Sequence, residues 1–169
     1  DGDELVVTEK ATNLIDVFPV GSSGVAGARV TSPSVGMTPF GFAFGRRNRL
    51  FVSEAVGGMA NASASSSYNL TAADTLQVIS GSVPNHETAA CWLVIDASGR
   101  FAYTTNTGSK TVSLFHIAHD GSLTVDARLG ATPAGGPIDA ESSNGGRYLS
   151  VLTPDAAPIV TFPMRAPGS

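Results

Sequence analysis

Short apolar runs alternate with short polar turns along this chain, and no stretch has the spacing of apolar residues that a helix requires. The pattern is clearest over residues 89–123, where three apolar runs are separated by the turns DASGR and NTGSK. A further turn at Asp120-Gly121 leads into a fourth run, residues 123–129. Four short strands joined by tight turns predict one four-stranded antiparallel sheet.

This unit repeats along the chain. Gly-Arg-Phe at 99–101 returns as Gly-Arg-Tyr at 146–148, 47 residues later. Upstream, Tyr68 precedes Phe115 by 47 residues, but Arg49 precedes Arg100 by 51, which places a four-residue insertion in the turn between these two strands. A repeat of 47 to 51 residues with four strands is the period of a β-propeller blade.

The repeats predict an all-β chain in which residues 1–169 form one propeller segment of about 3.5 four-stranded antiparallel blades. Its parts are a partial blade at 1–36, whole blades at 37–86 and 87–134, and a second partial blade at 135–169. Because the chain also begins without Met, we expect a piece of a larger ring. Its open ends would expose apolar sheet faces and unpaired edges, so we expect self-association or association with the missing half-ring.

The segment DASGRFAYTTNTGSKTVSLFHIAHDGSLT, residues 96–124, resembles the repeat of the lactonase-like seven-bladed β-propellers. That family has YVTN-type repeats and includes 6-phosphogluconolactonase-like and carboxymuconate cyclase-like proteins. The resemblance implies a small-molecule lactone or sugar acid as substrate and no cofactor. The family's histidines lie just before this turn, where Ala89 and Cys91 stand here, and the acid of its next turn is replaced by Asn106.

Glu9, Asp155 and five candidate site residues are predicted around the mouth of the propeller channel. His86 and Glu87 are candidate catalytic residues, because an imidazole beside a carboxylate on a loop can supply general acid–base chemistry. Glu54, Asn106 and Cys91 are candidates for binding substrate. The alternative is that His86 and Glu87 are ordinary solvated loop residues.

Cys91 is the only cysteine, which excludes an internal disulfide. It aligns with Phe40 and Ile138 of the neighbouring repeats, so we interpret it as a small buried residue rather than a nucleophile. His116 and His119 form an H-x-x-H pair, but no third ligand is evident, and we predict no metal site.

Residues 56–67 are small and polar without periodicity, which predicts a flexible loop raised over one face. This loop contains Asn61 in an N-glycosylation sequon, and Asn69 begins a second sequon. Arg46 and Arg47 are candidates for binding an anionic substrate, but their turn is expected at the opposite end from the acid–base pair.

The net charge of −4 and the absence of a Lys/Arg run exclude an electrostatic footprint for nucleic acid. The longest apolar runs are far shorter than a membrane span, so we expect no membrane partner. A secreted or periplasmic location is favoured. Two functions stay open: a hydrolase or cycloisomerase that opens or forms a lactone, and a non-catalytic propeller that binds a protein or glycan through its loop face.

Overall fold

The structure, a computed structural model, describes residues 2–143, 145–156 and 158–164. In these residues the strands are β1 (Glu4–Glu9), β2 (Leu14–Pro19), β3 (Val30–Pro33), β4 (Pro39–Gly45), β5 (Arg49–Glu54), β6 (Ala64–Leu70), β7 (Leu76–Pro84), β8 (Ala90–Ile95), β9 (Phe101–Asn106), β10 (Thr111–Ile117), β11 (Leu123–Ala131), β12 (Asp139–Ser142), β13 (Tyr148–Leu152) and β14 (Ile159–Pro163). The 3₁₀ turn η1 (Val56–Gly58) is the one helical element of this part of the chain, and no helix there is long and apolar enough to cross a membrane. The predicted all-β class is confirmed.

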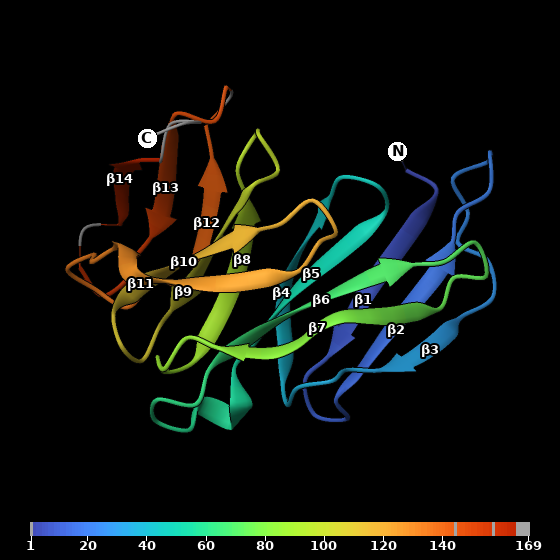
Figure 1. Cartoon of the computed structure of the whole chain (residues 1–169), viewed down its shortest axis with the longest axis horizontal. Coiled ribbons are helices and arrows are strands. Elements are labelled where there is room, and N and C mark those ends of the chain that lie inside the picture. The colour runs from blue at the N-terminus through green and yellow to red at the C-terminus, as the bar shows by residue number, and fades with distance from the viewer. Residues whose placement is uncertain (1, 144, 157, 165–169) are drawn as a thin grey trace.

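The strands form four antiparallel sheets, and within each sheet they follow one another in chain order. Strands β4–β7 and β8–β11 form two four-stranded sheets, whereas β1–β3 and β12–β14 form sheets of three strands. The sheets lie side by side in sequence order, from the blue to the red end of the chain (Figure 1). The two central sheets confirm the predicted four-stranded antiparallel blade.

The core consists of three apolar layers, each between two neighbouring sheets. Side chains alternate along a strand, so one strand serves two layers. On β5, Leu50 and Val52 pack with the first sheet, while Phe51 packs with the third. On β8, Leu93 faces back toward Phe51, and Val94 packs with the last sheet. This alternation makes each central sheet apolar on both faces.

Contacts to the main chain also hold neighbouring sheets together. The hydroxyl of Thr8 on β1 donates to the carbonyl of Phe40 on β4 at 2.7 Å. A Cβ atom at Gly41 would lie 2.6 Å from the Cα of Trp92, so glycine is what lets β4 approach β8. The first strands of the two central sheets are therefore in direct backbone contact.

The prediction of a flexible loop over residues 56–67 is wrong for its second half. Residues 64–67 belong to β6 and are buried between sheets. Their hydroxyls bond across the sheets: Ser65 Oγ lies 3.3 Å from Thr104 Oγ1, and Ser67 donates at 2.8 Å to a main-chain carbonyl of the β10–β11 turn. A strand that is covered on both faces can require small side chains, and a run of small residues in the sequence then resembles a low-complexity loop.

The insertion itself lies where the repeat offsets place it. Residues 55–63 connect β5 to β6, whereas the shorter segment 107–110 connects β9 to β10. Hydrogen bonds fix the longer connection at two points: the Gly57 N–H donates to Thr38 at 2.9 Å, and the Asn61 N–H donates to Thr88 at 3.0 Å. Hydrogen bonds therefore anchor the inserted loop at two points.

Candidate functional site

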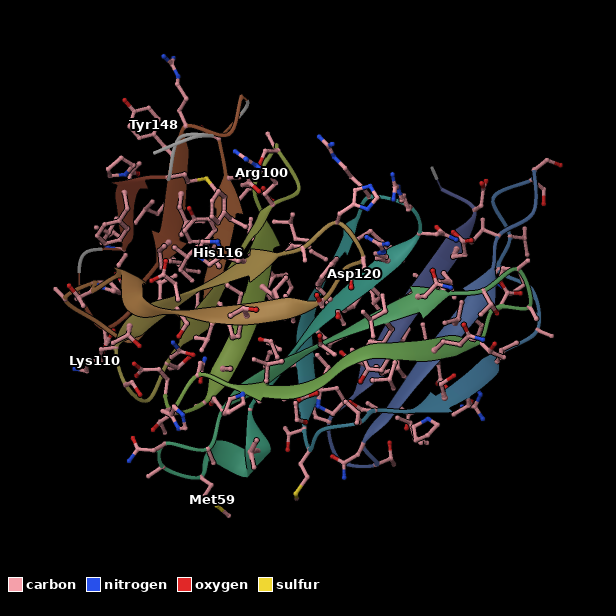
Figure 2. The ribbon with its side chains drawn as sticks, in the orientation of Figure 1. Met59, Arg100, Lys110, His116, Asp120 and Tyr148 are labelled. Atoms are coloured by element: carbon pink, nitrogen blue, oxygen red, sulfur yellow. The ribbon has the colours of Figure 1, made fainter. Side chains whose placement is uncertain are left out.

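Successive turns of an antiparallel sheet lie alternately at its two ends, which gives this molecule two sets of loops. One end is formed by the β1–β2, β5–β6 and β9–β10 connections together with the connections between sheets. We call it the long-loop end. The β4–β5, β8–β9 and β10–β11 turns form the arginine end. In Figure 2, Met59 and Lys110 mark the long-loop end, and Arg100 marks the arginine end.

The structure brings all five sequence-predicted site residues to the long-loop end. Glu54 and Asn106 end β5 and β9, Cys91 lies at the start of β8, and His86 and Glu87 lie in the connection before β8. A main-chain hydrogen bond joins these segments. Ala64 of β6 pairs with Glu54, and the N–H of the preceding residue, Ser63, donates to the Glu87 carbonyl at 3.0 Å.

Glu54 is a buried carboxyl group with both oxygens engaged. Its side chain accepts hydrogen bonds from the hydroxyls of Ser66 and Ser82, the latter at 2.7 Å, and from the N–H of Gly36. Burial raises the pKa of Glu54 above its ordinary value of 4.5, and these hydrogen bonds only partly offset that effect. The carboxyl is wholly inaccessible to solvent, and its role as a substrate-binding residue stays a prediction.

Asn106 is also fully buried, in a polar network of its own. Its Oδ1 accepts a hydrogen bond from Asn85 at 3.1 Å, and its Nδ2 donates to Thr111 at 3.0 Å and to Ser113 at 2.9 Å. The network ties the connection before β8 to the β9–β10 hairpin. All the polar atoms of the Asn106 side chain are used in this arrangement, and substrate binding by it stays a prediction.

Cys91 is half-buried, which corrects the interpretation of a small buried residue. The aligned Ile138 is 40% exposed, so this position at the start of the inner strand is partly open to solvent in more than one repeat. The Sγ of Cys91 lies 3.0 Å from the hydroxyl of Thr107. Its assignment to substrate binding stays a prediction.

His86 and Glu87 differ from the other three residues. His86 is exposed with a left-handed backbone, φ 60°, and Glu87 is half-buried. The main chain around them is fixed, because the Glu87 N–H donates to the Asn85 side chain at 3.1 Å. Within the described residues, neither side chain makes a hydrogen bond or an ion pair. Their polar atoms are therefore available to a ligand.

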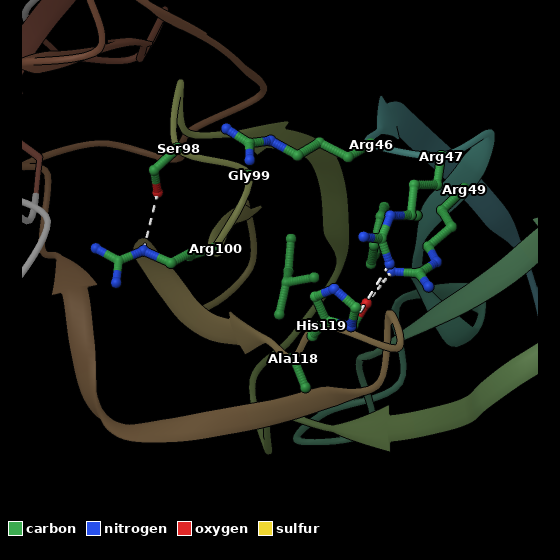
Figure 3. Close-up of a pocket in the computed structure, with 10 residues that line it drawn as sticks. Arg46, Arg47, Arg49, Ser98, Gly99, Arg100, Ala118 and His119 are labelled. Carbon is green, nitrogen blue, oxygen red and sulfur yellow. Dashed lines mark hydrogen bonds between the residues drawn. The ribbon is translucent and has the colours of Figure 1, made fainter.

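The arginine end holds a cavity of about 370 Å³ between the two central sheets (Figure 3). Arg46, Arg47 and Arg49 reach it from the β4–β5 turn, Arg100 from the β8–β9 turn, and His119 from the β10–β11 turn. We call this cavity the arginine pocket. The sequence identified Arg46 and Arg47 as candidate anion-binding residues but not the other three. Arg49 is the first residue of strand β5, and Arg100 and His119 lie about 50 to 70 residues further along the chain.

Two glycines and a main-chain carbonyl position the arginines. A Cβ at Gly99 would lie 3.1 Å from Nε of Arg46, and one at Gly121 would lie 2.6 Å from Cδ of Arg49. Both glycines have positive φ, as their turns require, and their missing side chains leave room for the arginine stems. Arg49 also donates to the carbonyl of His119 at 2.6 Å.

The two histidines of the H-x-x-H pair lie in different surroundings. The Nε2 of His116 lies 3.0 Å from the carboxylate of Asp126, and its ring packs edge-on against Phe101 at 5.1 Å between centroids. The Nδ1 of His119 instead lies 3.5 Å from Arg47. Across the described residues, no group of three or more His, Cys, Asp and Glu side chains could hold a metal ion.

The two sequons also differ. Asn61 is exposed in the β5–β6 connection, whereas Asn69 is half-buried in β6, paired with Arg49 on one side and Gln77 on the other. Glycosylation at either position stays a prediction. Asn61 is the more accessible of the two.

No protein-family model and no curated protein match this sequence. Solved structures match its fold. A protein of Bacteroides uniformis provisionally named as a 6-phosphogluconolactonase is 18% identical with a TM-score of 0.79, covering 100% of this chain and 52% of its own. The periplasmic gluconolactonase of Pseudomonas aeruginosa is 15% identical with a TM-score of 0.63, covering 92% and 50%.

A structure of the nidogen–laminin complex is 13% identical with a TM-score of 0.69, covering 96% of this chain and 56% of its own. The chain thus spans about half the length of these proteins. Together the comparisons confirm a β-propeller fold, which is similar to that of proteins named as lactonases. The number of blades in a complete ring stays a prediction.

Proposed function

We propose that this chain forms part of a lactonase-like propeller that opens a sugar lactone at the long-loop end, with His86 and Glu87 as the acid–base pair. One observation carries the proposal: of the five candidate residues, these two keep their polar atoms available while hydrogen bonds fix their main chain. General acid–base catalysis needs a positioned group with an unoccupied proton site. Similarity in fold to a protein named as a gluconolactonase supports the same reaction class.

In the proposed reaction, Glu87 takes a proton from a water molecule as the water oxygen bonds to the lactone carbonyl carbon. The bond from that carbon to the ring oxygen then breaks, and protonated His86 gives its proton to the departing oxygen. One water is consumed for each lactone, and the product is the open-chain hydroxy acid. Transfer of the proton from Glu87 back to His86 restores the starting state.

Acid release from glucono-δ-lactone, followed in a pH-stat, tests this function. Glu87→Gln and His86→Ala should each lower the catalysed rate about 100-fold, because each removes a group that transfers a proton in the proposed reaction. His119→Ala, at the arginine end, is the control and should keep the wild-type rate. A rate equal to that of spontaneous hydrolysis, or an equal loss in the control, contradicts the proposal.

A non-catalytic binding function is the second candidate. Met59, which is 64% exposed, lies in the β5–β6 connection, whose backbone is held by hydrogen bonds. A fixed loop with an exposed apolar side chain is suited to a protein partner, and similarity to the nidogen–laminin structure supports this class. Shortening this loop to the length of the β9–β10 connection should abolish partner binding while leaving any lactone turnover unchanged.

We also propose that the terminal sheets associate with further blades, either of a second copy or of a complementary half-ring. Val6 of β1 is buried against the next sheet, while its neighbours Leu5 and Val7 on the outer face are 48% and 41% exposed. At the other end Ile159 of β14 is 67% exposed. Sedimentation at micromolar concentration should show a species larger than 17.2 kDa. A compact monomer contradicts this association.

A further inference from the structure

The arginine pocket gathers positive charge in a chain whose net charge is −4. Four of the ten Lys and Arg residues line it, and none of the described residues that line it is acidic. Two basic side chains elsewhere have carboxylate partners: Arg29 lies 3.4 Å from Asp16, and Lys110 lies 3.9 Å from Asp155. Within the described residues, no carboxylate lies within 4.0 Å of a pocket arginine.

The carboxylates nearest in sequence to the pocket are engaged by their own turns. Asp96 accepts hydrogen bonds from the N–H groups of Arg100 at 2.9 Å and Phe101 at 2.8 Å. Asp120 accepts from the N–H and the hydroxyl of Ser122, at 3.0 and 2.7 Å. The Ser122 N–H is the main cause that lowers the pKa of Asp120. The charge of Arg49 also contributes to lowering the pKa of Asp120, so this carboxylate offsets part of the positive charge at one edge, although neither carboxylate lines the pocket.

The arginines come from two sheets and are not merely neighbours on one exposed turn. Arg46 crosses from the β4–β5 turn to lie over Gly99 of the next sheet, and Arg49 bonds to the His119 carbonyl of that sheet (Figure 3). Bringing like charges together across a sheet boundary is unfavourable without an anion. The guanidinium group matches the oxygens of phosphate with paired hydrogen bonds.

One side of the pocket is apolar. Ile117 and Ala118, at the end of β10, line it beside the arginines. Its volume of about 370 Å³ falls within the range of about 300–1,000 Å³ that is usual for small-molecule sites. A ligand with an anionic head and a small carbon body would use both sides.

We propose that the arginine pocket binds a small phosphate monoester, with the phosphate among Arg46, Arg47, Arg49 and Arg100 and the carbon body against Ile117. The pocket lies at the opposite end of the sheets from His86 and Glu87. It is therefore a separate site, and the inference does not depend on lactone chemistry.

Titration calorimetry with phenyl phosphate, inorganic phosphate and phenol tests this site. Phenyl phosphate should bind at one site per chain, inorganic phosphate should bind more weakly because it lacks the apolar contact, and phenol should not bind. The double substitution Arg47→Gln/Arg100→Gln should weaken phenyl phosphate binding at least about tenfold. Neither side chain donates to a main-chain carbonyl, so the variant should fold, which circular dichroism checks.

Arg147→Gln is the matched control. Arg147 holds the position of Arg100 in the next repeat, is exposed, and lies outside the pocket. It should leave the affinity unchanged. If Arg147→Gln weakened binding equally, the ligand would be binding to general surface charge. If inorganic phosphate and phenyl phosphate bound equally well, the carbon body of the ester would make no contribution to binding. Either result, or the absence of saturable binding, overturns the proposal.

Discussion

At the long-loop end, the carboxyl group of Glu54 is buried beneath two serine hydroxyls and a main-chain N–H. At the arginine end, four guanidinium groups surround a cavity with no carboxylate among its described lining residues. Both ends belong to the same sheets. They differ in whether the polar groups are satisfied inside the protein.

This difference separates structural from ligand-binding chemistry. A buried polar group that finds all its partners within the chain stabilises one arrangement of the loops and has little left to offer a substrate. An exposed charge with no ion-pair partner keeps most of its capacity for a ligand, even where it also donates a hydrogen bond within the protein, as Arg49 does to the His119 carbonyl. By this criterion Glu54 and Asn106 hold the long-loop end together, while His86, Glu87 and the pocket arginines are the groups to test for function.

Glu54 should give the largest effect on stability. Glu54→Ala leaves the hydroxyls of Ser66 and Ser82 and the Gly36 N–H without their acceptor and opens a cavity. We expect a loss of about 3 kcal/mol in the free energy of unfolding. Glu54→Gln keeps the shape and one acceptor oxygen and should cost about 1 kcal/mol or less. Urea denaturation measures both, and equal effects would contradict the role of the lost acceptors.

Asn106 should follow. Asn106→Ala removes the acceptor of Asn85 and the donor to Thr111 and Ser113, all inside the protein. We expect the free energy of unfolding to fall by about 2 kcal/mol. The comparison variant is Thr107→Val, which removes one half-buried hydroxyl of the same connection and its hydrogen bond to the Pro137 carbonyl, and it should cost less. An Asn106→Ala protein as stable as the wild type would show that this network does not hold the loops.

Glu54 should also make the free energy of unfolding depend on pH, an effect smaller than those of the two alanine substitutions. Its pKa in the folded state is raised above 4.5 by burial, so the folded protein binds this proton more tightly than the unfolded chain does. Stability from this group is fully present below pH 4.5 and is lost as pH rises through the folded-state pKa. The wild type should therefore lose stability relative to Glu54→Gln as pH increases. A constant difference between the two proteins from pH 4 to 8 would refute this.

The sequence predicts the fold well because turns carry local information. Asp120-Gly121 is a local hairpin-turn signal, and the turn residue Gly99, which has positive φ, returns 47 residues later as Gly146 with the same conformation. The position of the insertion between β5 and β6 follows from the same counting. Ser65–Ser67 were misread because burial between sheets, which requires small residues there, leaves no alternating apolar pattern.

The site is harder to predict because its partners come from different sheets. The hydrogen bonds of Glu54 to Ser66 and Ser82 require the register of three strands. The stem of Arg46 lies over Gly99, 53 residues away, and no local pattern encodes that contact. The sequence therefore placed residues at the correct end of the sheets, but it could not separate satisfied polar groups from available ones.

The smallest effects are expected at the arginine end, where they depend on salt. Arg47→Gln/Arg100→Gln should change the free energy of unfolding by no more than about 0.5 kcal/mol, because both side chains are exposed. Raising ionic strength from 0.01 to 0.15 M shortens the screening length from about 30 to about 8 Å. It should therefore weaken repulsion within the pocket and stabilise the wild type more than the double variant.

Arg29→Gln should respond to added salt in the opposite direction from the pocket variant. Arg29 lies 3.4 Å from Asp16 and 3.8 Å from Glu9, so salt weakens an attraction there rather than a repulsion. Relative to the wild type, this variant should gain from added salt, since it has no ion pair left to screen. If the pocket variant and Arg29→Gln respond in the same direction, the pocket arginines do not repel one another and the contrast between the two ends fails.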